Sequence, residues 1–545
     1  MNPTRRSLFR MGIAGVPAFA AAAPANRIAS NTVTNDQRLQ TALQIRMNAA
    51  QTDLAEPFPA QVNNGDETAF PNYIANFSKG LPHLANGEVD PAAYVKLISA
   101  INSGLASDYA AITPGFGTAF VDPMAGYAYE MQGLDSHAMT IPAAPSFSSA
   151  EMAAEMVELY WQAMARDIPF ANYDRSLVIQ RAAQDLAKLP AYSGPKNADG
   201  SISTSQVFRS TLPGALAGPY ISQFFLRPIP MNSTWVEQKY RVPLPGTDFL
   251  TAFDEWLLLQ GGLPPYRQYV FDSTPRYMNT GRAIAEWVHY DFLYQGFHNA
   301  ALILMNSGPE SILTGSKYWS PNNPYKGVKN MSGFSTFGAP HVCGMLGEVT
   351  IAALHAAWFQ KWMVHRRQRP EEFAGRVHQV ATGAAKYPIS QELLNSDALA
   401  RSYQLYGSYL LPQAFPEGAP LHPAYPAGHA TVAGACSALL KAFFDENALL
   451  TDNVVASADG LSLQPLNNVS LTVGGEINKL AFNIAMGRNF AGIHYRSDMS
   501  SGFRLGEDVT ISILRDSLPM FDETFTGFQF TRLDGTPVQI MKSSS

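Results

Sequence analysis

The spacing of apolar residues along the chain predicts a mainly α-helical protein. In residues 150–166 and 284–303 apolar side chains recur three and four positions apart, which places them on one face of a helix. The apolar run 430–444 follows a Pro/Gly-rich turn and is expected to be helical too. Strand-like alternation is scarce, and residues 467–472 are the main candidate for a short hairpin arm. We therefore expect a large helical bundle with few short strands.

Turn-forming residues and changes in polarity divide the chain into regions, and no internal repeat is evident. We expect residues 31–75 to form a polar N-terminal arm of extended chain or short helices. Residues 76–340 are predicted to be an N-terminal helical region, and residues 341–530 a C-terminal helical bundle that holds the functional site. Residues 531–545 have the composition of a polar tail.

Residues 1–30 have the pattern of a cleavable twin-arginine signal peptide. The adjacent Arg5 and Arg6 precede a weakly apolar stretch, and small residues around positions 21–25 suit a cleavage site. This pattern predicts export to the periplasm or the extracellular space; the alternative is a disordered basic N-terminus. The apolar stretch is shorter than the ~20 residues that cross a bilayer, and stable membrane insertion is not expected.

Composition narrows the class of protein further. Of the 545 residues 46% are hydrophobic and 15% are charged, which is typical of a packed globular protein, and the net charge of -6 argues against nucleic-acid partners. The two cysteines, Cys343 and Cys436, are too few for a disulfide scaffold; free thiols are the simpler interpretation, and a single bridge is the alternative. Nine of the eleven histidines lie between His289 and His494, so we expect the chemistry in the C-terminal half.

A first candidate cluster spans residues 358–370. Helical periodicity would place near one face Trp358, Lys361 (or Trp362), His365 and Arg369. The proline that follows Arg369 disfavours helix there, so we expect the helix to stop at Arg369. The alternative is a solvated basic helix terminus that complements the helix dipole.

The second cluster is a Pro/Gly turn that contains His422, Gly428 and His429, just before an apolar helix. Glycine permits close approach of a ligand, and the unpaired N–H groups of a first helical turn attract anions. The two histidines could exchange protons near neutral pH. The alternative is a turn with a capping histidine.

The third cluster contains Arg488, His494 and Asp498. A carboxylate beside a histidine fixes its tautomer and raises its basicity, which suits a metal ligand or a nucleophile. A core histidine beside a structural ion pair is the alternative. Combined, the clusters supply three cations, helix-start amides and three histidines, an inventory that fits one tetrahedral oxyanion such as phosphate or vanadate.

The arrangement Lys-x7-Arg-Pro from Lys361, Pro-x-Gly-His ending at His429, and Arg-x5-His-x3-Asp from Arg488 resembles a known superfamily. That superfamily joins the vanadium haloperoxidases and the type-2 phosphatidic acid phosphatases. The spacing from Lys361 to Arg369, and His422 before the turn, are similar to the algal and bacterial vanadium bromoperoxidases. Upstream similarity extends the resemblance over roughly residues 60–530, which favours the haloperoxidases.

The resemblance implies a vanadate cofactor held by side chains and a backbone amide of the three clusters. His494 would bind vanadium through a ring nitrogen, and Asp498 would orient it. The groups implied to neutralise the vanadate oxygens are Lys361, Arg369, Arg488 and the amide of Gly428.

The resemblance also implies the reaction, in which hydrogen peroxide oxidises bromide or another halide to a hypohalous acid equivalent that halogenates small organic substrates. His429 would be the acid–base group, with His422 close by, and Lys361 would make a peroxide oxygen more electrophilic. Trp358 would line the halide side of the pocket, or would be a core tryptophan. Relatives commonly form homo-oligomers, so one is expected here.

The sequence departs from the family pattern at Ala427, where a serine usually hydrogen-bonds a vanadate oxygen. Losing one hydrogen bond to a charged group costs about 1.5–3 kcal/mol, so we expect weaker vanadate binding. Two alternatives stay open: an acid phosphatase of the same superfamily, and a non-catalytic oxyanion-binding homologue.

Overall fold

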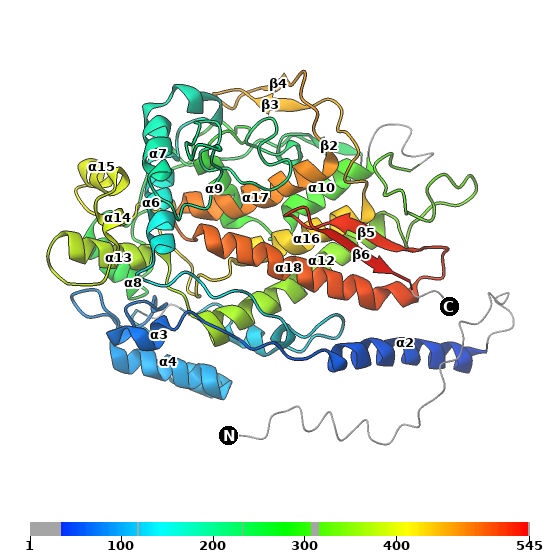
Figure 1. The fold of residues 1–545 in the computed structure, drawn as a ribbon, viewed down its shortest axis with the longest axis horizontal. Helices are drawn as coiled ribbons and strands as arrows, with labels where there is room; N and C mark the ends of the chain where they lie inside the picture. Colours follow the sequence, from blue (N-terminus) through cyan, green and yellow to red (C-terminus); the bar gives the residue numbers. More distant parts are fainter. Residues whose placement is uncertain (1–33, 117–118, 232, 307–314, 543–545) are drawn as a thin grey trace.

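A computed structural model describes residues 34–116, 119–231, 233–306 and 315–542, and the predicted signal peptide 1–30 lies outside them. Helices dominate and strands are few, which confirms the mainly α fold class (Figure 1). The α-helices are α2 (Asn35–Ala55), α3 (Asp66–Ala69), α4 (Pro91–Ser103), α5 (Ala106–Ala110), α6 (Ala150–Ala165), α7 (Leu177–Ala187), α8 (Phe253–Gln260), α9 (Gly281–Tyr290), α10 (Gln295–Met305), α12 (Ala339–Phe359), α13 (Pro370–Ala381), α14 (Gln391–Leu394), α15 (Asp397–Tyr406), α16 (Gly428–Phe443), α17 (Val473–Ala491) and α18 (Arg496–Ser517).

Short 3-10 turns and three antiparallel strand pairs complete the described structure. The 3-10 turns are Pro71–Tyr73, Pro123–Tyr127, Ser136–Ala138, Phe170–Arg175, Gln223–Phe225 and Leu518–Met520. The strand pairs are β1 (Ile229–Met231) with β2 (Thr234–Val236), β3 (Val454–Ala456) with β4 (Leu463–Pro465), and β5 (Gly527–Thr531) with β6 (Pro537–Met541).

The hairpin arm expected at residues 467–472 is wrong. The nearest hairpin is β3–β4, and residues 467–472 contribute an isolated bridge between Leu449 and Thr472. Asn468 has a left-handed φ of 62°, which interrupts an extended strand, and Thr472 serves as the N-cap of α17 by accepting a hydrogen bond from Gly475 N.

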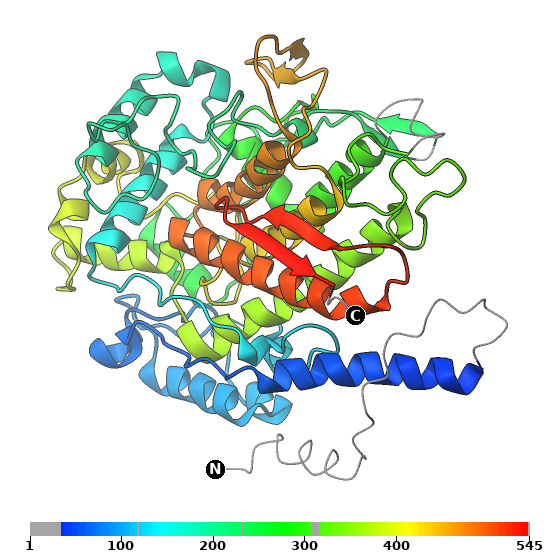
Figure 2. The ribbon, with the colours of Figure 1, turned by 45° about the vertical axis from the view of Figure 1, so that its right-hand side comes forward.

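Helix α16 lies at the centre of the C-terminal bundle, among α12, α17 and α18 (Figures 1 and 2). Every residue of α16 except His429 is buried. Glycine lets α18 approach its backbone: a Cβ on Gly506 would lie 1.8 Å from the carbonyl oxygen of Thr431. The helix starts are also joined, because Ala427 N donates to Asp498 O at 3.0 Å. The first turns of α16 and α18 are therefore fixed relative to each other.

Of the two segments that apolar periodicity predicts to be helical, one forms a single helix and the other does not. Residues 150–166 form α6 as expected, with the Ser149 hydroxyl accepting a hydrogen bond from Met152 N at the helix start. Residues 284–303 are not one helix, because α9 ends at Tyr290 and α10 begins at Gln295. The interruption brings Asp291 into the interior of the C-terminal bundle.

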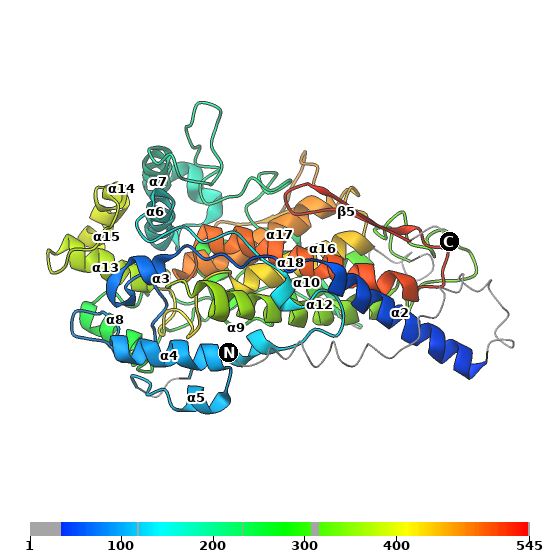
Figure 3. The same cartoon turned by 60° about the horizontal axis from the view of Figure 1, so that its bottom comes forward.

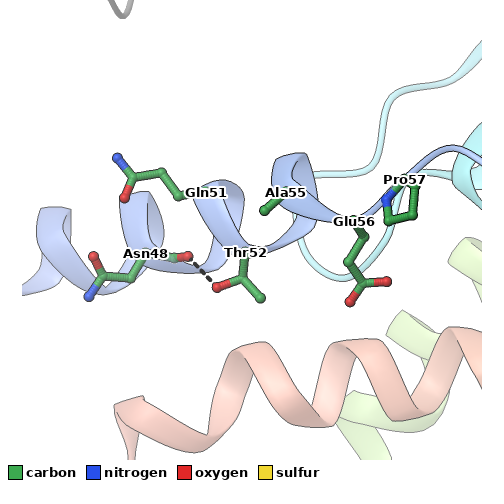
Figure 4. Close-up of a pocket in the computed structure, with 6 residues that line it drawn as sticks. All are labelled: Asn48, Gln51, Thr52, Ala55, Glu56 and Pro57. Carbon is green, nitrogen blue, oxygen red and sulfur yellow. Dashed lines mark hydrogen bonds between the residues drawn. The ribbon is translucent and has the colours of Figure 1, made fainter.

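The N-terminal arm contains α2, a 21-residue helix that runs along the edge of the molecule and reaches beyond its body (Figures 2 and 3). None of its residues is buried. Its C-terminal end is held by Arg515, whose guanidinium pairs with Asp53 and Glu56. An open surface hollow lies along this helix and contains none of the predicted site residues (Figure 4).

Two further expectations are tested by the fold. Cys343 and Cys436 are both free thiols, so they are not bridged in the described part of the chain. The stretch Ala339–His365 is long and apolar enough to cross a membrane by length and composition alone. More than half of its apolar window is buried inside the protein, where it packs against α16 and α18 as a core helix.

The polar tail expected at residues 531–545 is wrong in its central part, because β6 pairs with β5 and the hairpin packs against α16. Phe528 on β5 is 1% exposed and contacts the aromatic rings of Phe443, Phe521 and Phe525. Within residues 531–545 the buried apolar side chains are Leu533 and Ile540, and their polar neighbours concealed them in the overall polarity of the segment.

We predict that Phe528→Ala destabilises the protein by about 3–5 kcal/mol, because it removes a buried ring and leaves a cavity. Gln529→Ala on the same strand is the matched control, since Gln529 is exposed. Thermal unfolding of both variants checks this. Equal melting temperatures for the two would show that the hairpin is not part of the packed core.

Candidate active site

The backbone between Lys361 and Arg369 does not continue as the single helix that periodicity suggested. After α12, Gln360–His365 form a π-helical segment, and Arg366 then adopts a left-handed φ of 43°. Arg369 is the N-cap of α13, with Pro370 as the first residue of that helix. Arg369 is extended, as expected for the residue before a proline. Its expected place at the end of the preceding helix is wrong, because that helix already ends at His365 and Pro370 begins a new one.

Lys361 lies on the π-helical segment with its ammonium group fully buried. Its Nζ donates hydrogen bonds to the carbonyl oxygens of Pro423, at 2.7 Å, and Ala424, at 2.9 Å. Among the described residues it forms no ion pair with a carboxylate within 4.0 Å. Burial, and then the nearby charge of Arg369, holds the pKa of Lys361 well below its ordinary value.

Arg369 is also fully buried, and its guanidinium lies among backbone oxygens and two imidazoles. Its Nε donates to His422 O at 2.8 Å, and its Nη1 donates to Ile493 O at 2.9 Å. The same Nη1 lies 2.9 Å from Nε2 of His494, and Nη2 lies 3.0 Å from Nδ1 of His422. Arg369 therefore joins the second and third sequence clusters.

Arg488 on α17 is the third buried cation. Its Nη1 donates to Val288 O at 2.6 Å, and its Nε has no hydrogen-bond partner in the described structure. Burial lowers the pKa of both Arg369 and Arg488 to about 10. Like Lys361, neither arginine forms an ion pair with a described carboxylate. Unpaired buried charges are costly, so this part of the fold is suited to an anionic ligand.

His494 lies against these cations with one ring nitrogen already used. Its Nδ1 is 2.8 Å from Oδ2 of Asp498, which fixes the proton on Nδ1 and leaves the lone pair of Nε2 directed toward Arg369. Burial and Arg369 hold the pKa of His494 well below its ordinary value, so the imidazole is neutral. Within the described residues no cluster of three or more His, Cys, Asp or Glu side chains is arranged to hold a metal ion. The arrangement suits an oxyanion held by charge with one nitrogen ligand.

The start of α16 supplies the backbone part of the site. Ala427 is the N-cap residue and, within the described structure, its side chain makes no capping hydrogen bond. Gly428 and His429 are the first helical residues, so their amide groups have no acceptor within the helix. Burial lowers the pKa of His429, whereas Asp291 acts in the opposite direction.

Asp291 is a site residue that the sequence did not reveal. Its Oδ1 lies 2.9 Å from Nε2 of His429. The two residues are 138 positions apart, and Asp291 belongs to no motif; it enters the site because α9 ends there. Because the carboxylate accepts Nε2–H, the Nδ1 atom of His429 keeps a free lone pair that can accept a proton.

Trp358 and His422 form a wall of the site. Their ring centroids are 4.8 Å apart, and the Nζ of Lys361 lies 5.8 Å from the Trp358 ring. Trp358 is only partly buried, and its Nε1 donates to Val121 O at 3.0 Å, so it is not a fully enclosed core tryptophan. His365, which periodicity placed on this face, instead interacts with the side chain of Gln360.

Comparisons with known proteins agree with this site. A family model described as the VCPO second helical-bundle domain matches residues 342–522. The vanadium-dependent bromoperoxidase of Ascophyllum nodosum is 34% identical over 507 residues, which cover 89% of each chain. That of Corallina officinalis is 32% identical over 92% of this chain and 98% of its own.

The chain belongs to the vanadium-dependent bromoperoxidase family. The solved homohexameric vanadate-dependent bromoperoxidase AnII of Ascophyllum nodosum superposes with a TM-score of 0.89 at 28% identity, over 99% of this chain and 96% of that chain. The similarity of this bromoperoxidase-family chain thus extends well beyond the bundle that carries the three motifs. The phosphatase and non-catalytic alternatives are not favoured.

If His429 accepts a proton in the reaction, we predict that Asp291→Asn slows bromide oxidation about 10- to 100-fold, because an imidazolium at His429 would lose its charged hydrogen-bond partner. The carboxylate raises the pKa of His429, so its loss lowers that pKa and moves the acid limb of the activity profile to lower pH. Steady-state rates measured across pH check both effects.

Glu417→Gln is the matched control for Asp291→Asn. Glu417 pairs with another histidine, His289, at 2.6 Å, and like Asp291 it lies near Arg488. If both variants shift the pH profile equally, His429 is not the group that Asp291 assists.

Proposed function

We propose that this chain is a vanadate-dependent bromoperoxidase that uses hydrogen peroxide to oxidise bromide to a hypobromous acid equivalent. One observation carries the proposal: the cations Lys361, Arg369 and Arg488 are buried without a described carboxylate as ion-pair partner. Beside them His494 presents its unprotonated Nε2, which lies 2.9 Å from Nη1 of Arg369. Vanadate carries the negative charge that these cations require, and it accepts a nitrogen ligand. When bound, it supplies a Lewis-acidic vanadium(V) centre that activates peroxide without changing its oxidation state.

The cations are suited to hold the vanadate oxygens. The Nζ of Lys361 has three donor hydrogens, of which Pro423 and Ala424 accept two. The third is left for an oxygen of the bound anion or of peroxide, where it would withdraw electron density from that oxygen. The unpartnered Nε of Arg488 and the Gly428 amide are further donors for the same ligand.

Proton transfer is assigned to His429. Its Nδ1 would take a proton from peroxide, and Asp291 would stabilise the resulting imidazolium through Nε2–H. The side chain of His429 is 13% exposed, whereas those of Asp291 and His494 are 2% exposed, which suits a group that meets substrates arriving from solvent. Trp358, with His422 behind it, is placed to line the halide side.

The same proposal extends to assembly and location. We expect a homo-oligomer, as the AnII relative is homohexameric. The twin-arginine pattern at Arg5 and Arg6 supports export to the periplasm or the extracellular space. Small organic molecules that react with the oxidised halogen are the expected final substrates.

The direct test is bromination of a phenolic dye by the purified protein, with bromide and hydrogen peroxide fixed and orthovanadate titrated from zero. We expect a saturable rate that depends on vanadate, and Lys361→Ala should weaken it. Folded protein that gives no bromination at any vanadate concentration would exclude the proposed reaction.

We further predict that Ala427→Ser tightens vanadate binding about 10- to 100-fold, because a hydroxyl at the N-cap adds a hydrogen bond of about 1.5–3 kcal/mol to the charged ligand. Equilibrium dialysis against orthovanadate measures this for both proteins. Ala435→Ser, a buried position further along α16, is the control, and its dissociation constant should not fall. A serine at 427 that binds no tighter would show that other donors compensate fully.

A further inference from the structure

Arg367 lies outside the set of residues that would touch vanadate, yet it is buried directly behind His494. It is 3% exposed, and its Nη1 donates to Oδ1 of Asp498 at 2.7 Å. Its guanidinium lies 3.8 Å from the centroid of the Tyr495 ring, which covers one of its faces. The π-helical segment and the left-handed Arg366 turn the chain so that Arg367 points into this interior position.

The two carboxylate oxygens of Asp498 accept hydrogen bonds from different groups. Its Oδ2 accepts hydrogen bonds from Nδ1 of His494, at 2.8 Å, and from Tyr495 N, at 3.0 Å. Its Oδ1 accepts the bond from Arg367. Because Asp498 is fully buried, these donors rather than solvent determine the plane of the carboxylate.

Arg367 is held in turn by the N-terminal half of the chain. Its Nη2 donates to Oε2 of Glu155 on α6 at 2.9 Å. Glu155 also accepts hydrogen bonds from the backbone N of Ser497, at 2.6 Å, and from its hydroxyl, at 3.0 Å. The guanidinium of Arg367 therefore pairs with two carboxylates at once: that of Glu155 on α6, and that of Asp498, which contacts His494.

We propose that Arg367 is a positioning residue for the vanadium ligand: by fixing the carboxylate of Asp498 against Glu155, it holds Nδ1–H of His494 in place and keeps Nε2 directed into the oxyanion site. This rests on the proposed function for vanadate itself. Without Arg367, Oδ1 of Asp498 is a buried acceptor that has lost its hydrogen-bond partner, and the carboxylate is free to rotate. The hydrogen bond that orients His494 then weakens.

A purely structural ion pair would have a different effect, and the chain contains one for comparison. Arg496 is 5% exposed and pairs with Glu158, one helical turn along α6 from Glu155. Its Nε donates to Glu158 at 2.8 Å, and its Nη1 donates to Arg209 O at 3.1 Å. Arg496 thus ties the same two helices, α6 and α18, together, and within the described structure its side chain forms no hydrogen bond or ion pair with Asp498 or His494.

The experiment compares Arg367→Gln with Arg496→Gln. Vanadate affinity is measured by equilibrium dialysis, and unfolding is measured by thermal melting. We expect Arg367→Gln to raise the vanadate dissociation constant about 10- to 100-fold, the range typical of losing an outer partner of a metal ligand. Arg496→Gln should lower the melting temperature comparably and leave the dissociation constant unchanged. Equal effects on affinity, or none from Arg367→Gln, would overturn the proposal.

A second readout does not require vanadate. Nitrogen-15 spectra of histidine-labelled, vanadate-free protein report which ring nitrogen is protonated, and His494→Gln assigns the signal. We expect His494 to be neutral with the proton on Nδ1 in the wild type and in Arg496→Gln, and this signal to change in Arg367→Gln. An unchanged signal in Arg367→Gln would contradict the proposal even if vanadate binding proved to be absent from the wild type.

Arg367→Lys keeps the experiment decisive if Arg367→Gln fails to fold. Lysine retains the charge but lacks the planar fork that contacts Asp498 and Glu155 together. It should restore stability while leaving a smaller loss of vanadate affinity. A folded Arg367→Lys protein with wild-type affinity and a wild-type His494 signal would show that only charge is needed, and the positioning role would be rejected.

Discussion

The structure depends on three buried cationic side chains, none of which forms an ion pair with a described carboxylate. Lys361 lies on the π-helical segment that follows α12, Arg369 caps the start of α13, and Arg488 lies on α17. Each donates to backbone carbonyls instead of carboxylates. Removing a charge from water costs several kcal/mol, and carbonyl dipoles recover only part of that cost. A multiply charged anion completes the balance, which is why a bundle otherwise built from apolar helices contains such a site.

The rest of the fold keeps these charges from rearranging. Glycine contacts such as that of Gly506 pack the interior of α18 against the first turns of α16. The hydrogen bond from Ala427 N to Asp498 O joins the starts of the two helices. The π-helical segment allows Lys361 and Arg369, although close in sequence, to reach the site from two different helices. Carboxylates are present, but they lie one layer outward: Asp498 contacts His494, and Asp291 contacts His429. In these positions they set the tautomers of the imidazoles without cancelling the charge of the oxyanion pocket.

The sequence was sufficient to predict the helical class, the three clusters and their convergence, because short motifs keep their spacing whatever the surrounding topology. It could not supply contacts that depend on topology alone. Asp291 reaches His429 across 138 positions, and Glu155 reaches Arg367 across 212. Periodicity failed where the backbone leaves a regular helix, at Arg366 and at the break between α9 and α10. The hairpin β5–β6 was missed because only two apolar residues of the segment 531–545, Leu533 and Ile540, are buried in the described structure, and they stand among polar neighbours.

The most direct test of the central claim is the melting temperature of the vanadate-free protein as orthovanadate is added. If the buried cations bind vanadate in the folded protein, the melting temperature should rise progressively with vanadate concentration, following the binding equilibrium. Chloride at equal ionic strength should not reproduce this rise, and Lys361→Ala should reduce it. A melting temperature that is insensitive to vanadate, in correctly folded protein, would contradict the account.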